Sequence, residues 1–66
     1  MPRYRVGDRV KIQPESATLF AGLEAVIQEI RPHKRGITEL DSYIVLLQSG
    51  EQHMFYDVQL TRVDWS

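Results

Sequence analysis

Apolar and polar residues alternate along several short stretches of the chain, which is the pattern of β-strands with one buried face. The first such stretch ends at Ile12. Even spacing places Val6, Val10 and Ile12 on one face, so all three are predicted to point toward the core. Gly7 and Asp8 near the start of this stretch predict a turn, with Asp8 as its capping residue.

A second strand is predicted from Leu23 to Ile30. Ala25 and Ile27 alternate there, and the last residue of the stretch returns to the inner face one position late, as a β-bulge would produce. The alternative for this region is an amphipathic helix over residues 15–30. A glycine in its middle and the absence of a continuous stripe with 3.6-residue spacing favour the strand.

The clearest strand runs from Tyr43 to Leu47 and is rich in β-branched and aromatic residues. It is apolar on both faces: Tyr43, Val45 and Leu47 lie on one side, Ile44 and Leu46 on the other. This pattern predicts either a central strand buried on both sides or a face reserved for a partner.

The last third of the chain continues the sheet. A hairpin turn is predicted at residues 48–51, with Gly50 at the position that needs an unusual φ. Gln52 to Tyr56 is the returning strand. Asp57 to Leu60 fits one helical turn with Asp57 as its N-cap, and Thr61 to Asp64 is predicted to close the sheet.

Two loops separate these strands. Proline, serine and threonine break the alternation over residues 13–18, and Leu19 and Phe20 are predicted to fold back over one end of the core. The second loop extends from Arg31 to Asp41, and its first six residues hold three cations together with a proline and a glycine. Long exposed loops of compact domains are often where binding takes place.

Short strands separated by turns predict an all-β fold, either a small barrel or a sandwich. A barrel would also remove the exposed edges of an open sheet, so a small five-stranded barrel is expected, with one short helical turn before the last strand. The 66 residues are expected to form a single domain, residues 1–66, with a small core.

Composition narrows the function classes. The chain has no cysteine, so disulfides and thiolate metal sites are excluded. Its formal net charge of −1 argues against a protein whose main task is coating nucleic acid. No apolar run is long enough to cross a bilayer, and no apolar segment of a secretory signal follows Met1, so a cytoplasmic location without membrane contact is expected.

Residues Gly7-Asp-Arg-Val-Lys-Ile12 and Phe20-Ala-Gly-Leu-Glu-Ala-Val-Ile27 together resemble the KOW motif. This motif occurs in the C-terminal domain of the transcription factor NusG, in its paralogue RfaH and in some ribosomal proteins. The resemblance implies an SH3-like five-stranded barrel, and Leu60 to Val63 suits its last strand. Ala25 stands where the motif usually has a second glycine, and the loops before Leu19 and after Ile30 are longer than usual.

The opening Gly-Asp-Arg-Val, the Tyr43-Ile-Val45 strand and the Leu60 to Val63 ending also resemble the type B dihydrofolate reductases. That family forms tetramers of SH3-like chains around a pore that carries a Gln-Ile-Tyr tripeptide and a lysine. This chain has Gln52-His-Met-Phe-Tyr56 in place of the tripeptide and Ile12 near the expected lysine, so the activity is not expected.

No catalytic constellation is found. His33 and His53 lie twenty residues apart and lack further ligands, so they are interpreted as partly exposed polar residues and no metal is expected. Among the six aromatic residues, Phe20 and Phe55 are predicted to be buried and Trp65 to be a frayed terminal residue. Tyr56 is as readily placed outside the barrel as inside it.

The function expected from the sequence is a non-catalytic module that binds another protein, without a cofactor. Its predicted surface combines Tyr56 with the basic loop residues Arg31, His33, Lys34 and Arg35. The first alternative is a KOW-like RNA- or ribosome-binding accessory that uses Arg3, Arg5, Lys11 and the same loop. A small subunit of an electron-transfer complex and a homo-oligomeric pore enzyme are the further alternatives.

Overall fold

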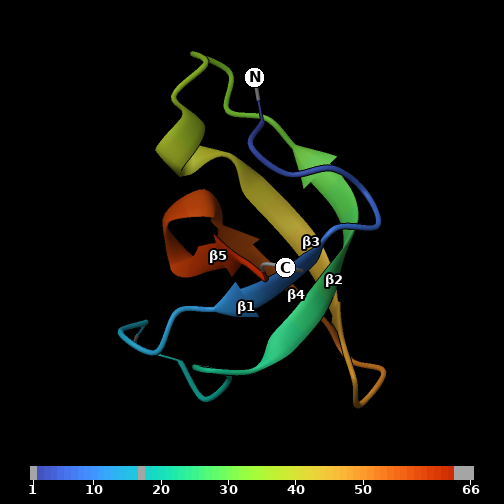
Figure 1. Ribbon diagram of the computed structural model, residues 1–66. Helices are drawn as coiled ribbons and strands as arrows, with labels where there is room; N and C mark the ends of the chain where they lie inside the picture. Colours follow the sequence, from blue (N-terminus) through green and yellow to red (C-terminus); the bar gives the residue numbers. More distant parts are fainter. Residues whose placement is uncertain (1, 17, 64–66) are drawn as a thin grey trace.

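Five antiparallel strands form one sheet in the order β4-β3-β2-β1-β5 in the computed structural model, which describes residues 2–16 and 18–63 (Figure 1). The all-β prediction is therefore confirmed, as is the short helical turn before the last strand. The elements are β1 (Arg9–Ile12), β2 (Glu24–Arg31), the 3-10 turn η1 (Thr38–Leu40), β3 (Ser42–Leu47), β4 (Gln52–Tyr56), the 3-10 turn η2 (Asp57–Gln59) and β5 (Leu60–Arg62).

The core lies on the concave face of this curved sheet, because every strand turns its alternate residues inward. Tyr4 joins the core from outside the strands, and its ring meets that of Tyr43 edge to face at 5.3 Å. Phe55 is buried as predicted, and Phe20 is partly buried against it. The buried apolar residues are Tyr4, Val10, Ile12, Ala25, Ile27, Tyr43, Val45, Leu47, Phe55 and Leu60.

A bulge interrupts β2 where the sequence predicts it. The pairing of β2 with β3 shifts between Ile27 and Glu29, so one extra residue is inserted into β2. As a result Ile30 turns back toward the core, against which it is partly buried.

Three local predictions are wrong. Val6 is 64% exposed because the strand begins only at Arg9, after a turn in which Gly7 has a φ of 93°. The side chain of Asp8 does cap this turn, as expected, by accepting the Arg5 N–H. Leu19 is 97% exposed, so only Phe20 folds back onto the core.

The third correction concerns the helical turn. Asp57 is the first residue of η2, and Tyr56 occupies the N-cap position. The side-chain oxygen of Gln59 accepts the Tyr56 N–H at 2.9 Å, while Asp57 is buried and serves another contact. The last strand ends at Arg62; the predicted Asp64 and Trp65 lie outside the described residues.

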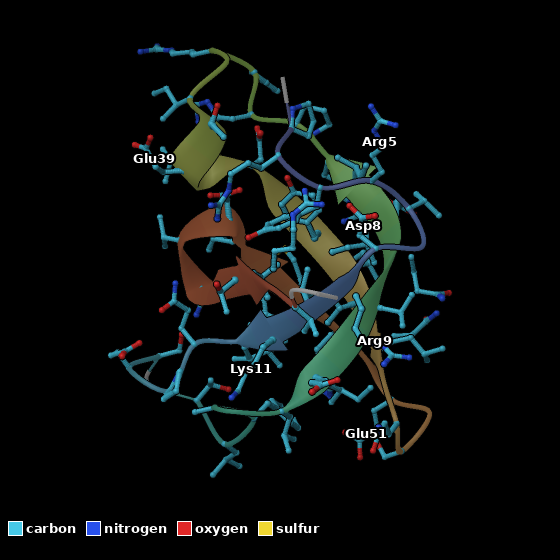
Figure 2. The ribbon with its side chains drawn as sticks, in the orientation of Figure 1. Arg5, Asp8, Arg9, Lys11, Glu39 and Glu51 are labelled. Carbon is cyan, nitrogen blue, oxygen red and sulfur yellow. The ribbon has the colours of Figure 1, made fainter. Side chains whose placement is uncertain are left out.

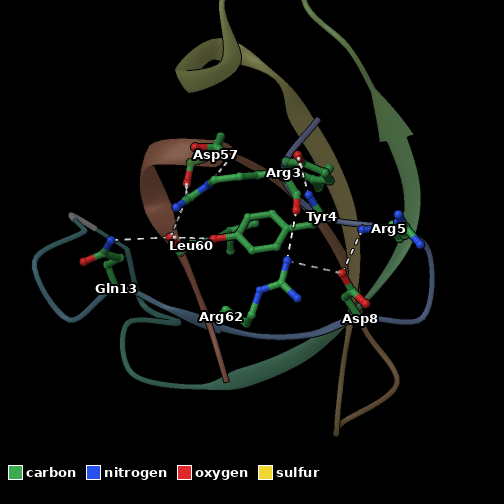
Figure 3. A network of polar contacts seen from close by, with 9 residues as sticks. Arg3, Tyr4, Arg5, Asp8, Gln13, Asp57, Leu60 and Arg62 are labelled. Carbon is green, nitrogen blue, oxygen red and sulfur yellow. Dashed lines mark hydrogen bonds and ion pairs between the residues drawn. The ribbon is translucent and has the colours of Figure 1, made fainter. Parts of the chain in front are cut away.

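Within the described ranges, no ladder joins β4 to β5, so closure of the barrel by hydrogen bonds is not confirmed. β4 and β5 are instead the two edges of the sheet, joined through η2. The N-terminal residues run beside β5 (Figure 3), where their side chains bond to it.

Candidate binding surface

The convex face of the sheet brings two of the predicted binding residues into one row. Ser42 of β3 pairs with Arg31 of β2 on one side and with Tyr56 of β4 on the other. Residues paired across strands point to the same face, so Arg31 and Tyr56 are separated by two strand spacings, about 10 Å. Tyr56 is 44% exposed, so it lies outside the core.

Apolar side chains continue from Tyr56 across this convex face. Ile44 pairs with Met54, which is 46% exposed, and both point away from the core. Leu46 follows Ile44 on the same face and pairs with Val26 of β2. An exposed sheet face normally carries polar residues at these alternate positions. We call the set Val26, Ile44, Leu46, Met54 and Tyr56 the convex apolar face.

A shallow groove of about 320 Å³ hollows one end of the convex apolar face. Val26 and Leu46 supply its apolar floor, and one basic and one acidic residue, Arg9 and Glu24, also line it. Gly50 of the hairpin turn completes it. The groove and the Tyr56 row therefore lie at opposite ends of one surface.

The loop from Arg31 to Asp41 is held in place from inside the molecule. The buried carboxylate of Asp41 accepts the His33 N–H at 2.6 Å, and the Asp41 carbonyl accepts the Asp57 N–H. His33 Nδ1 in turn accepts the Arg35 N–H at 3.2 Å, so the His33 ring stabilises the turn. Since the loop is anchored at both ends, its shape is largely set before any partner binds.

The three cations of this loop differ in their surroundings. Arg31 makes a 2.6 Å ion pair with Glu29, and both side chains are more than half exposed. Lys34 and Arg35 are exposed in the turn that follows. Beside the Tyr56 row the structure thus places Arg31, whereas Lys34 and Arg35 lie further along the loop.

Arg3, which the RNA-binding alternative would use, belongs to a different polar cluster (Figure 3). Its Nε atom donates to the buried carboxylate of Asp57 at 3.1 Å. Burial disfavours the charged Arg3 guanidinium, but the bond to Asp57 and the nearby charges outweigh that effect and raise its pKa. Arg62 donates to the Arg3 carbonyl at 3.0 Å.

Tyr4 completes this cluster. Its hydroxyl donates to the Leu60 carbonyl at 3.3 Å, and the guanidinium groups of Arg3 and Arg62 lie near its ring. Burial raises the pKa of Tyr4, with the Arg3 charge acting in the opposite direction. These contacts attach the N-terminal segment to β5, which is a structural role.

Among the described residues, no three His, Cys, Asp or Glu side chains gather as metal ligands. His53 pairs with Glu51 at 2.9 Å, and its ring lies 4.3 Å from that of Phe20. His33 lies in the loop from Arg31 to Asp41, where it contacts Arg35, so the two histidines have different partners.

No family model matches the chain, and no curated protein and no solved structure matches it. The likeness to KOW-type barrels and to type B dihydrofolate reductases therefore stays a prediction from the sequence. In the described part of the chain, none of the helical segments has the length and apolar character needed to span a bilayer.

Part of the surface was missed by reasoning from the sequence. Ile44 and Leu46 stood out because they make the second face of their strand apolar. Val26 and Met54 give no such signal, because polar residues stand two positions away from them: Glu24 and Gln28 beside Val26, and Gln52 beside Met54. Only the cross-strand register shows that they extend the same face.

Proposed function

We propose that the chain is a non-catalytic module that binds a segment of another protein on the convex apolar face. The observation that carries the proposal is that this face brings together two exposed and three partly exposed apolar side chains next to a basic, internally anchored loop. Contiguous exposed apolar surface of this kind is typical of interaction sites. The SH3-like character of the barrel and a cytoplasmic location remain parts of this proposal.

The charges beside the face indicate the chemistry of the partner. Arg31, Lys34 and Arg35 lie at one end, and Arg9 lines the groove at the other. Between them, β3 and β4 carry no charged residue, and on the β2 side the partner of Ile44 is Glu29, which forms an ion pair with Arg31. The partner segment is therefore expected to be apolar in its middle, with acidic residues that face the basic loop.

RNA binding is the alternative that the test must separate from this proposal. Arg9 and Lys11 lie on β1, and Arg5 lies just before the turn that leads into it (Figure 2). Asp8 lies among these cations. A net charge of −1 and the use of Arg3 by Asp57 both weaken that alternative.

The test is affinity capture from a lysate of the source organism with three tagged proteins: the wild type, Ile44→Ser and Val58→Ser. Ile44 lies in the centre of the convex apolar face, whereas Val58 is an equally aliphatic, 55% exposed residue of η2 outside it. One protein should be captured by the wild type and by Val58→Ser and lost from Ile44→Ser, with or without nuclease. Circular dichroism must show that both variants are folded.

Two results would contradict the proposal. The first is capture that Ile44→Ser leaves unchanged, because the binding site would then lie elsewhere. The second is loss of all captured material on nuclease treatment, which would favour the RNA-binding alternative.

A further inference from the structure

The hydrogen bonds at the two ends of the β3–β4 hairpin determine which backbone groups of β4 face away from β3. At the turn, the Leu47 N–H donates to the Glu51 carbonyl at 2.9 Å. At the other end, the Asp57 N–H donates to the Asp41 carbonyl at 2.8 Å. In an antiparallel ladder, directly bonded pairs alternate with non-bonded pairs. The bonded pairs between these ends are therefore Val45 with His53 and Tyr43 with Phe55.

The other β4 residues turn their N–H and C=O groups toward the open edge of the sheet. Gln52 and Met54 form non-bonded pairs with β3, and both side chains are exposed. The Tyr56 N–H also points outward but is already bound by Gln59. Across residues 2–16 and 18–63, no bond from another backbone segment reaches Gln52 or Met54.

This edge also lacks the features by which proteins usually protect edge strands. Such strands commonly carry lysine, proline or an inward charge that prevents pairing with another chain. Gln52–Tyr56 has no lysine, arginine, carboxylate or proline. The first loop touches the inner side of β4 through the Phe20 ring on His53, and its described backbone bonds lead elsewhere.

We propose that a second copy of this chain pairs with β4 in antiparallel orientation, about a two-fold axis that passes beside His53. The open edge offers one N–H and one C=O at Gln52 and again at Met54. When the edge is rotated onto itself, Gln52 of each copy faces Met54 of the other. All four donors and all four acceptors are then satisfied in four hydrogen bonds.

The register follows from the Tyr56–Gln59 bond. A two-fold axis beside Met54 would set Gln52 against Tyr56 of the second copy, whose N–H is already bonded to Gln59 at 2.9 Å. A two-fold axis beside His53 leaves the bond between Tyr56 and Gln59 intact. It also sets Met54 of each copy next to Gln52 on the convex side, so the two convex faces form one continuous surface.

This dimer does not rest on the proposed function, because it uses the outward backbone groups of β4 and not the side chains of the convex apolar face. Sedimentation velocity over a range of protein concentrations is the first measurement. The wild type should show a monomer–dimer equilibrium. Gln52→Pro removes one outward N–H per chain, and thus two of the four bonds, while leaving every ladder bond to β3 intact. It should raise the dimer Kd by about 10- to 100-fold.

Cysteine crosslinking tests the register, and the natural absence of cysteine makes it specific. In the proposed dimer, His53 faces His53 of the second copy in a non-bonded pair, with the Cα atoms about 4.5 Å apart. That distance lies within the range of a disulfide. His53→Cys should therefore crosslink to a covalent dimer under mild oxidation. Val58→Cys is the matched exposed control and should stay monomeric under reducing and oxidising denaturing electrophoresis.

Ile44→Ser separates this proposal from the proposed function. It should abolish capture of the protein partner and leave the monomer–dimer equilibrium unchanged, whereas Gln52→Pro should weaken the dimer alone. A wild-type chain that stays monomeric at millimolar concentration overturns the dimer. A dimer that Gln52→Pro does not weaken, or that His53→Cys does not crosslink, overturns the assignment to the β4 edge.

Discussion

The two edges of the sheet differ in how their backbone is covered. At β5, the Leu60 carbonyl is approached by the side chains of Tyr4, Arg3 and Gln13, and Arg62 ties the strand to the N-terminal segment (Figure 3). At β4, the outward groups of Gln52 and Met54 meet no other described backbone. We call these the covered edge and the open edge.

The difference shows where a small sheet protein stabilises itself and where it leaves surface for other molecules. A domain of this size has a small core, so each residue added to it matters. The covered edge contributes Tyr4 to that core and supplies Asp57 with its cation. The open edge contributes only Phe55 fully and continues into the convex apolar face. Stability and binding are therefore expected to depend on opposite edges.

The largest effect is expected from replacing the same residue type at each edge. Tyr4→Ala removes a ring that is 1% exposed and should lower the free energy of unfolding by about 3–5 kcal/mol. That is a large part of the total stability of a small domain. Tyr56→Ala removes a half-exposed ring at the open edge and should cost less than about 1 kcal/mol. Urea denaturation followed by circular dichroism measures both. Equal losses would remove the distinction between the edges.

Proline substitution tests the alternation of backbone groups along the open edge. His53→Pro removes an N–H from the ladder with β3 and should cost about 2–3 kcal/mol. The neighbouring Gln52→Pro removes an N–H that faces away from β3 and should be nearly neutral when measured on dilute protein. Thermal denaturation of the two variants gives the comparison. If Gln52→Pro were the more damaging, the assignment of outward groups would be wrong.

The β3 strand and the bulge in β2 could be predicted, because the spacing of apolar residues along a strand reflects which side chains are buried. Val45 and Leu47 alternate with Ile44 and Leu46, and the bulge in β2 follows from the late return of Ile30. The alternation fails at Val6, which has the right spacing but precedes the turn at Gly7. A period of two says nothing about where a strand begins.

The contacts that cover the β5 edge could not be predicted, although the last strand itself was expected near its observed place. Arg3 and Asp57 are 54 positions apart, and neither has a neighbour in the sequence that suggests an ion pair. Tyr4 follows three residues of no clear pattern, so nothing predicts that it enters the core. These contacts depend on how the ends of the chain meet in three dimensions, which only the sheet order determines.

A smaller effect is expected from the ion pairs. Arg3→Ala leaves the Asp57 carboxylate, whose side chain is 5% exposed, without its cation and should cost about 1–2 kcal/mol. Arg31→Ala breaks a pair whose two side chains are 58% and 56% exposed and should cost less than about 0.5 kcal/mol. Denaturation in low and high salt measures both changes. A larger loss from Arg31→Ala would show that the covered edge owes little to Arg3.

The smallest effect is expected from pH, and it acts at the covered edge. Burial raises the pKa values of Tyr4 and Tyr43 above the ordinary value of 10.0; the Arg3 charge opposes this at Tyr4, and the Tyr4 N–H does so at Tyr43. The unfolded chain therefore loses these protons at a lower pH than the folded chain. The stability that the two phenols contribute is complete below pH 10 and falls as the pH rises above it.

Tyr4→Phe isolates this contribution, because it keeps the ring and removes only the hydroxyl that donates to Leu60. The variant should be somewhat less stable at pH 8, yet it should lose less stability than the wild type between pH 9 and pH 11. All other side chains are the same in both proteins, so their contribution cancels in the difference. Denaturant midpoints across this range provide the measurement. Parallel pH profiles would show that the Tyr4 hydroxyl ionises equally easily in the folded and unfolded chains.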